Sequence, residues 1–169
     1  MESRAKLFGH ALHPILIVFP LGLLSTSVIF DIIHIATGNP QWAVVSFWMI
    51  ISGVIGGAVA AVFGLIDFLA IPPRTRAKAV GLLHAVTALS VLTLFFASWL
   101  VRFNDPDSPS TLAFLLSFVG AGGALMTGWL GGELVERLGV GVDTGAHLNA
   151  PNSLKQPHVT PRATEARTV

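Results

Sequence analysis

The run AVVSFWMIISGVIGGAVAAVFGLI, residues 43–66, contains no charged side chain. A helix needs about 20 apolar residues to cross the hydrocarbon core of a bilayer, so this run predicts a transmembrane helix, which we extend over residues 43–71. Small residues recur on one face of this helix and predict the close approach of a neighbouring helix. They are Ser46, Gly53, Gly57, Ala60 and Gly64.

Three further segments have comparable length and hydropathy, at residues 12–36, 79–101 and 111–135. The breaks between the four spans are short and carry turn-forming glycine, asparagine and proline. Short connections force consecutive helices to run antiparallel, so the predicted fold is an all-α, up-down-up-down membrane bundle. The composition agrees, because 11% of the residues are charged against about 25% in soluble domains.

Residues 1–138 are predicted to form the transmembrane domain, and residues 139–169, which are polar and contain prolines, a flexible cytoplasmic tail. Lysine and arginine flanking the spans favour the cytoplasmic side. The N-terminal side carries six such residues and the opposite side has only Arg102. The six are Arg4, Lys6, Arg74, Arg76, Lys78 and Arg137. Both termini are therefore expected in the cytoplasm, and the protein in the plasma (inner) membrane.

Several classes of function are disfavoured by the sequence. The chain has no cysteine, which excludes disulfides, thiolate iron–sulfur ligation and cysteine nucleophiles. It has no nucleophile elbow and no phosphate-binding glycine loop, so we expect no catalytic activity of its own. The basic residues are explained by membrane orientation, so no nucleic-acid partner is expected. The expected partners are the lipid bilayer and other membrane subunits, including electron-transfer proteins.

Ionisable residues within a span are costly and therefore mark candidate sites. Helical steps of three and four from His13 place Asp31 and His34 on the same face of the first span. This face should point into the bundle, and Pro20 should kink the helix because it lacks the N–H that would bond to Leu16. Asp31 and His34 are expected to pair at the outer end.

Antiparallel packing should bring a second group of ionisable residues to the N-terminal end of the bundle. His84 is expected about 9 Å inside the third span. The other members are His13, Asp67 and Glu133.

This group supports two cofactor hypotheses. In the first, one haem b lies between the first and third spans with His13 and His84 as axial ligands, and the glycines of the second span leave room for the macrocycle. In the second, a zinc, iron or manganese ion is bound by His13, Asp67, His84 and Glu133.

Two readings need no cofactor. In one, Asp67 pairs with Arg74 or Arg76 and the histidines bond across helices, so that the protein is a non-catalytic scaffold or a subunit of a membrane complex. In the other, the polar groups at the two ends move protons or a small solute. The apolar middle of the spans disfavours this last reading.

Several short motifs carry a resemblance to a known family. They are Leu12-His13-Pro14 with Phe19-Pro20, Gly64-Leu-Ile-Asp67, His84, Gly128-Trp-Leu-Gly-Gly-Glu-Leu-Val135 and Gly139-Val-Gly-Val142. Over about residues 10–143 the chain resembles the bacterial membrane family catalogued as domain of unknown function 2231.

The resemblance implies a four-span membrane domain without an established activity. Some relatives look fused to Rieske-type or cytochrome-type domains, which implies a redox setting. Relatives often have a second histidine where this chain has Val18, and an aromatic-plus-histidine pair near residues 136–138. A site that needs those extra histidines is not expected in this chain.

Overall fold

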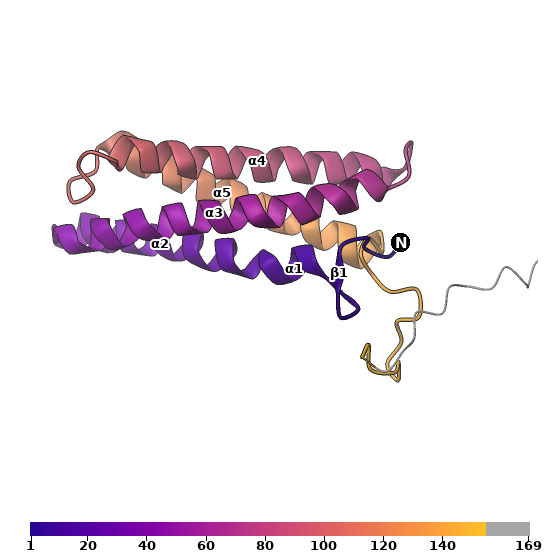
Figure 1. Ribbon diagram of the computed structural model, residues 1–169. Helices are drawn as coiled ribbons and strands as arrows, with labels where there is room; N and C mark the ends of the chain where they lie inside the picture. The colour runs from indigo at the N-terminus through magenta and orange to yellow at the C-terminus, as the bar shows by residue number, and fades with distance from the viewer. Residues whose placement is uncertain (155–169) are drawn as a thin grey trace, which may run out of the picture.

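A computed structural model of the chain describes residues 1–154, and the rest of the predicted tail lies outside the described residues. Four antiparallel helical spans lie side by side (Figure 1). The first span is divided into α1 (Leu12–Leu16) and α2 (Val18–Thr37), followed by α3 (Pro40–Ala70) and α4 (Arg76–Arg102). The fourth is α5 (Thr111–Gly132), continued by the π-helix η1 (Glu133–Arg137).

The two ends of the bundle differ. At one end, which we call the proximal end, lie the N-terminus, the α3–α4 turn and η1 (Figure 1). A short hairpin of β1 (Lys6–Leu7) and β2 (His10–Ala11) precedes α1 there. The opposite, distal end carries the α2–α3 turn and the α4–α5 loop (Figure 1).

All four spans are long and apolar enough to cross a membrane, and their outer surface is apolar. Leu125 is 80% exposed and Trp129 69% exposed. Six polar or charged residues of the spans are instead buried inside the bundle: Ser27, Asp31, Ser46, Ser98, Arg102 and Ser117. Apolar side chains outside and polar ones inside suit a lipid environment, so the predicted all-α membrane bundle is confirmed.

The division of the first span lies at the predicted kink. α1 ends at Leu16, and Ile17 separates it from α2. Pro20 has no backbone N–H, so the carbonyl of Leu16 lacks the donor that would continue the helix. The second span begins earlier than expected because Asn39 caps α3, its side chain accepting a hydrogen bond from the N–H of Gln41 at 3.0 Å.

Glycines bring α2 close to α3, and α4 close to α5. A Cβ atom added at Gly53 would lie 2.7 Å from two side-chain carbons of Leu24, and one added at Gly120 would lie 2.9 Å from Phe95. Leu24 and Phe95 belong to the buried core together with Ile50 and Val91.

The two ends of the described chain are hydrogen-bonded to each other. The amino group of Met1 donates to the carbonyl of Gly139 at 2.7 Å, and the N–H of Gly141 donates to the carbonyl of Met1 at 2.8 Å. The hydroxyl of Thr144 donates to Glu2 at 3.0 Å. Ordered contacts therefore continue through Thr144, six residues past the predicted domain boundary at residue 138.

Gly53→Ala is expected to lower the thermal unfolding midpoint in detergent, because overpacking a close helix contact costs about 1–3 kcal/mol. Gly128→Ala is the matched control, since a Cβ atom at Gly128 meets nothing within 4 Å. An unchanged midpoint for Gly53→Ala would contradict the packing of α2 against α3.

Candidate functional site

His13 lies on α1 at the proximal end and reaches across to α3. Its Nδ1 is 2.8 Å from the carbonyl oxygen of Ala60. A carbonyl can only accept, so Nδ1 carries the proton and, in the neutral imidazole, Nε2 keeps a free lone pair. The ring packs on Gly64, where an added Cβ atom would lie 2.9 Å from ring atoms Cε1 and Nδ1.

His84 lies on α4 and contacts α5 in the same way that His13 contacts α3. Its Nδ1 is 3.0 Å from the carbonyl oxygen of Thr127, so Nδ1 is again the protonated nitrogen. The ring packs beside Gly131, where an added Cβ atom would lie 3.4 Å from Cε1. In both cases the glycine follows the accepting residue by one helical turn.

The two imidazoles meet inside the bundle. Their ring centroids are 6.3 Å apart and their planes are 87° to each other. Within residues 1–154, neither Nε2 atom has a hydrogen-bond partner. Neither Nε2 atom is completely shielded from solvent. Metal-bound histidines typically bond their other ring nitrogen to a carbonyl or carboxylate, which fixes the ring, and both histidines have this arrangement.

Asp67 at the end of α3 accepts hydrogen bonds from the N-terminal segment. The hydroxyl of Ser3 lies 2.8 and 2.7 Å from its two carboxylate oxygens, and the N–H of Arg4 donates at 2.8 Å. The expected pairing of Asp67 with Arg74 or Arg76 is therefore wrong. The segment before β1 folds back over the end of α3 and supplies nearer donors.

Glu133, the fourth candidate metal ligand, is bonded to Arg76 at 2.5 Å. Within the described residues, no group of three or more histidine, aspartate and glutamate side chains could hold a metal ion. The structure brings together His13 and His84 from the candidate set, while Asp67 and Glu133 have other partners.

The glycines of α3 do not leave the open space expected beside a macrocycle. The space beside Gly53 is filled by Leu24, the space beside Gly57 by Leu92 and the space beside Gly64 by His13. Their role in the structure is close packing against neighbouring side chains.

A second polar group, absent from the candidate set, lies near the distal end. Arg102 donates from Nη1 and Nη2 to the two carboxylate oxygens of Asp31, at 2.6 and 2.7 Å. Both side chains are 0% exposed. Ser46 and Ser98 accept further hydrogen bonds from Arg102 at 3.2 Å, and Ser117 donates to Asp31 at 2.9 Å.

This ion pair corrects the expected pairing of Asp31 with His34. The Nδ1 of His34 bonds to the carbonyl of Asn39 at 2.9 Å, and its ring stacks on Phe114. A guanidinium matches a carboxylate with two parallel bonds and lowers the cost of burying it, which a histidine at the helix end does not.

Arg102 was counted among the residues that flank the spans, because it lies just past the predicted end of the third span. One signal could have found it. Helical steps of three and four from His84 pass through Ser98 and reach Arg102. A buried Asp31 on the first span required a cationic partner at the same depth.

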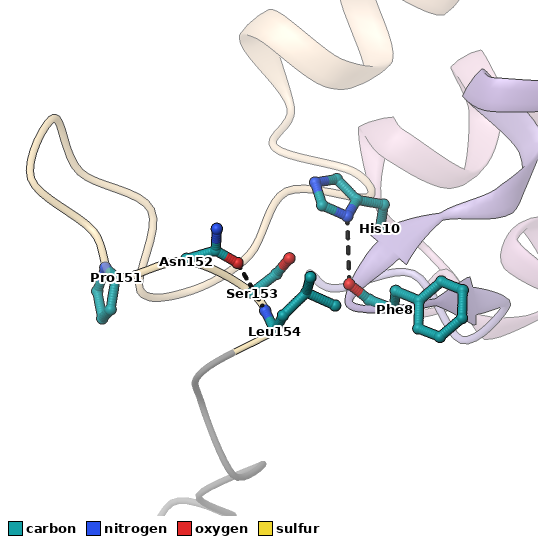
Figure 2. A pocket seen from close by; sticks show the side chains of 6 residues that line it. All are labelled: Phe8, His10, Pro151, Asn152, Ser153 and Leu154. Carbon is teal, nitrogen blue, oxygen red and sulfur yellow. Dashed lines mark hydrogen bonds between the residues drawn. The ribbon is translucent and has the colours of Figure 1, made fainter.

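Outside the bundle, a shallow crevice separates the β1–β2 hairpin from residues 151–154. Figure 2 shows Phe8 and His10 on one side and Ser153 and Leu154 on the other. His10 bonds through Nδ1 to the carbonyl of Phe8 at 3.3 Å. No candidate site residue lines this crevice.

The fold and these polar groups define a four-helix integral membrane protein with paired imidazoles at one end and a buried ion pair near the other. Residues 9–144 match the family described as predicted membrane protein (DUF2231). The chain belongs to this family. No curated protein and no solved structure matches the chain significantly.

Beside the proximal site, Glu2 joins the two ends of the described chain. The ammonium group of Lys6, bonded to it at 2.5 Å, and then the N–H and hydroxyl of Thr144 lower the pKa of Glu2 from 4.5 to about 2. A lowered carboxylate pKa stabilises the contact above the unfolded pKa and loses that contribution as pH falls through the folded value.

The amide of Thr144 should therefore lose protection from hydrogen exchange as the pH falls from 4.5 to about 2. Protection is taken relative to the intrinsic exchange rate at each pH. In Glu2→Gln the amide should be less protected and insensitive to pH over this interval. Equal pH dependence in both proteins would refute the assignment to Glu2.

Proposed function

We propose that this membrane protein binds one haem b, which His13 and His84 would hold, and carries electrons. The observation behind the proposal is the pair of neighbouring imidazoles, each fixed through Nδ1 by a carbonyl of the neighbouring helix. A metal bound by one nitrogen of each ring at about 2 Å would allow ring centroids up to about 6 Å apart. The observed separation is 6.3 Å.

The number of available ligands favours haem over a bare ion. Protein sites for zinc usually supply three or four side chains, whereas the described residues place only two imidazoles together. A porphyrin supplies four nitrogens of its own, so two histidines complete the coordination of its iron.

The residues around the two rings have distinct tasks. The carbonyls of Ala60 and Thr127 hold each ring in the tautomer that presents Nε2. Gly64 and Gly131 let the rings lie against the helix backbone. Of the cationic residues at the proximal end, Lys6, Arg76 and Lys78 bond to Glu2, Glu133 and the carbonyl of Phe68. The others would suit the two carboxylates of a haem: Arg4, Arg74 and Arg137.

A haem held by both His13 and His84 would supply one-electron redox chemistry and would not need to bind a substrate. The proposed role is therefore electron transfer within the membrane, with a donor or acceptor protein as partner.

A metal ion held by the two imidazoles is the second candidate. It is favoured by the 6.3 Å separation of the rings, because a single ion bound by both Nε2 atoms would need no room for a macrocycle. Asp67 and Glu133 would have to leave Ser3 and Arg76 to complete such a site.

We also propose that the proximal end faces the cytoplasm, with the protein in the plasma membrane. All six flanking lysines and arginines of the predicted cytoplasmic side belong to the proximal end. Arg102 is buried in its ion pair with Asp31 and does not count as a flanking charge. The distal turns at residues 38–39 and 103–110 contain no lysine or arginine. They carry Asp105 and Asp107 instead. The charge bias is therefore stronger than the simple count suggested.

Purified full-length protein from cells supplied with a haem precursor should show a Soret band, which His13→Ala and His84→Ala should each abolish. Each of these substitutions removes one of the two side chains proposed to bind the iron. His34→Ala and His10→Ala are matched controls and should keep the band, because both residues bond elsewhere.

Elemental analysis of the same preparations separates the alternatives. A metal without a Soret band, lost in His84→Ala, would replace the haem proposal with the metal-ion proposal. Neither cofactor, with unchanged behaviour of both histidine variants except in stability, would favour the scaffold role.

The absence of native cysteine allows the proposed orientation to be tested by labelling. A membrane-impermeant maleimide should label Ser108→Cys in the distal loop of intact cells. It should label Ala146→Cys at the proximal end only after the cells are permeabilised. The reverse pattern would show that the proximal end faces outward.

A further inference from the structure

We infer that the bundle consists of two equivalent helical hairpins, residues 12–70 and 83–132, packed about a pseudo-twofold axis. The Asp31–Arg102 ion pair makes the first hairpin pack against the second hairpin rather than against another copy of itself. The inner face of each hairpin is thus a docking surface whose partner is the other hairpin. This inference does not depend on whether the imidazoles bind a cofactor.

The first helices of the two hairpins bury matching positions. Asp31 and Arg102 are 71 residues apart, and the same spacing relates His13 to His84. It also relates every buried residue of α2 to a buried residue of α4. The matched buried residues are Pro20, Leu24, Ser27 and Asp31 on α2, and Val91, Phe95, Ser98 and Arg102 on α4. The remaining buried residue of α4, Gly81, lies before the second hairpin begins at residue 83.

The second helices repeat with a spacing of 67 residues, seen in the glycine positions 53 and 120, 56 and 123, and 64 and 131. Each pair of glycines meets equivalent side chains. Gly53 faces Leu24 as Gly120 faces Phe95. Likewise, Gly56 faces Pro20 as Gly123 faces Val91.

The imidazoles extend the correspondence to hydrogen bonds. His13 bonds to Ala60 beside Gly64, and His84 bonds to Thr127 beside Gly131. Ala60 and Thr127 are related by the spacing of the second helices. These contacts within one hairpin are thus reproduced at equivalent positions within the other.

The hairpins run in the same direction, since α1 and α4 both start at the proximal end (Figure 1). Two residues at equivalent positions can touch each other only near the axis that relates the hairpins. His13 and His84 meet in this way, and so do Asp31 and Arg102. The axis therefore runs along the bundle and passes through both pairs.

Opposite charges at equivalent positions decide which hairpins can pack together. Two copies of the first hairpin would place two Asp31 carboxylates against each other, and two copies of the second would oppose two Arg102 guanidiniums. A like-charged pair inside a membrane bundle has no favourable partner. Only the unlike pairing neutralises the buried groups, which is specificity achieved by penalising the alternatives.

The test is a charge-reversal cycle in the full-length chain, made with a fluorescent tag and expressed in membranes. Asp31→Arg and Arg102→Asp each reproduce within one chain the contact of a like-with-like pairing. Each should lower the monodisperse peak in detergent size-exclusion chromatography by about tenfold or more, because an uncompensated buried charge is strongly destabilising.

The double variant Asp31→Arg/Arg102→Asp should recover to within about threefold of the wild-type peak, because the reversed pair again neutralises both charges. Ser27 and Ser98 occupy equivalent positions beside the exchanged groups. A double variant as impaired as the single variants would overturn the equivalence of the hairpins. A single variant with a wild-type peak would overturn selection by charge.

The control is the less buried pair of Arg76 and Glu133, whose side chains are 64% and 18% exposed against 0% for Asp31 and Arg102. The substitution Arg76→Glu, at the exposed member, should alter the peak by less than about twofold, and Glu133→Arg should have a smaller effect than either change to the buried pair. This control separates the effect of burial on the axis from a general effect of charge reversal on expression.

Discussion

The ion pair between Asp31 and Arg102 constrains every helix of the distal half of the bundle. An unpaired charge in the interior of a membrane protein is costly, so each of these side chains must be within hydrogen-bond distance of the other. Asp31 lies on α2 and Arg102 on α4, while Ser46 on α3 and Ser117 on α5 complete their hydrogen bonds. The four helices therefore have one depth and one rotation at which all these bonds form. Apolar contacts with lipid set no such register, because they are nearly equivalent for any rotation of a helix.

Much of the fold could be predicted from the sequence because the responsible signals are local. The long uncharged runs locate the spans, the short turns make them antiparallel, and Pro20 locates the division of the first span. Helical periodicity also placed His13 and Asp31 on one inward face. The pairing of His13 with His84 followed from the antiparallel order alone.

The partners of the other charged residues depend on tertiary contacts that produce no periodic pattern in the sequence. Asp67 bonds to Ser3 because eleven residues before α1 fold back over the end of the bundle, and those residues have no helical pattern. Glu133 meets Arg76 only because η1 continues α5 beside the start of α4. Arg102 was counted as a residue flanking the third span because span ends were judged by hydropathy, which places a buried arginine outside the membrane.

The two imidazoles of the proximal site belong to helices of different length. His84 is part of an uninterrupted helix that is anchored at its far end by Arg102, so its position is tied to the register of the whole bundle. His13 is part of the short helix α1, which is separated by Ile17 from the part of the span that carries Asp31. The hydrogen bonds from the N–H of Ile17 to His13 and from the N–H of Leu21 to Ile17 keep α1 and α2 joined across this position. One imidazole is therefore held by the register of the whole bundle, and the other by a short helix and its bond to Ala60.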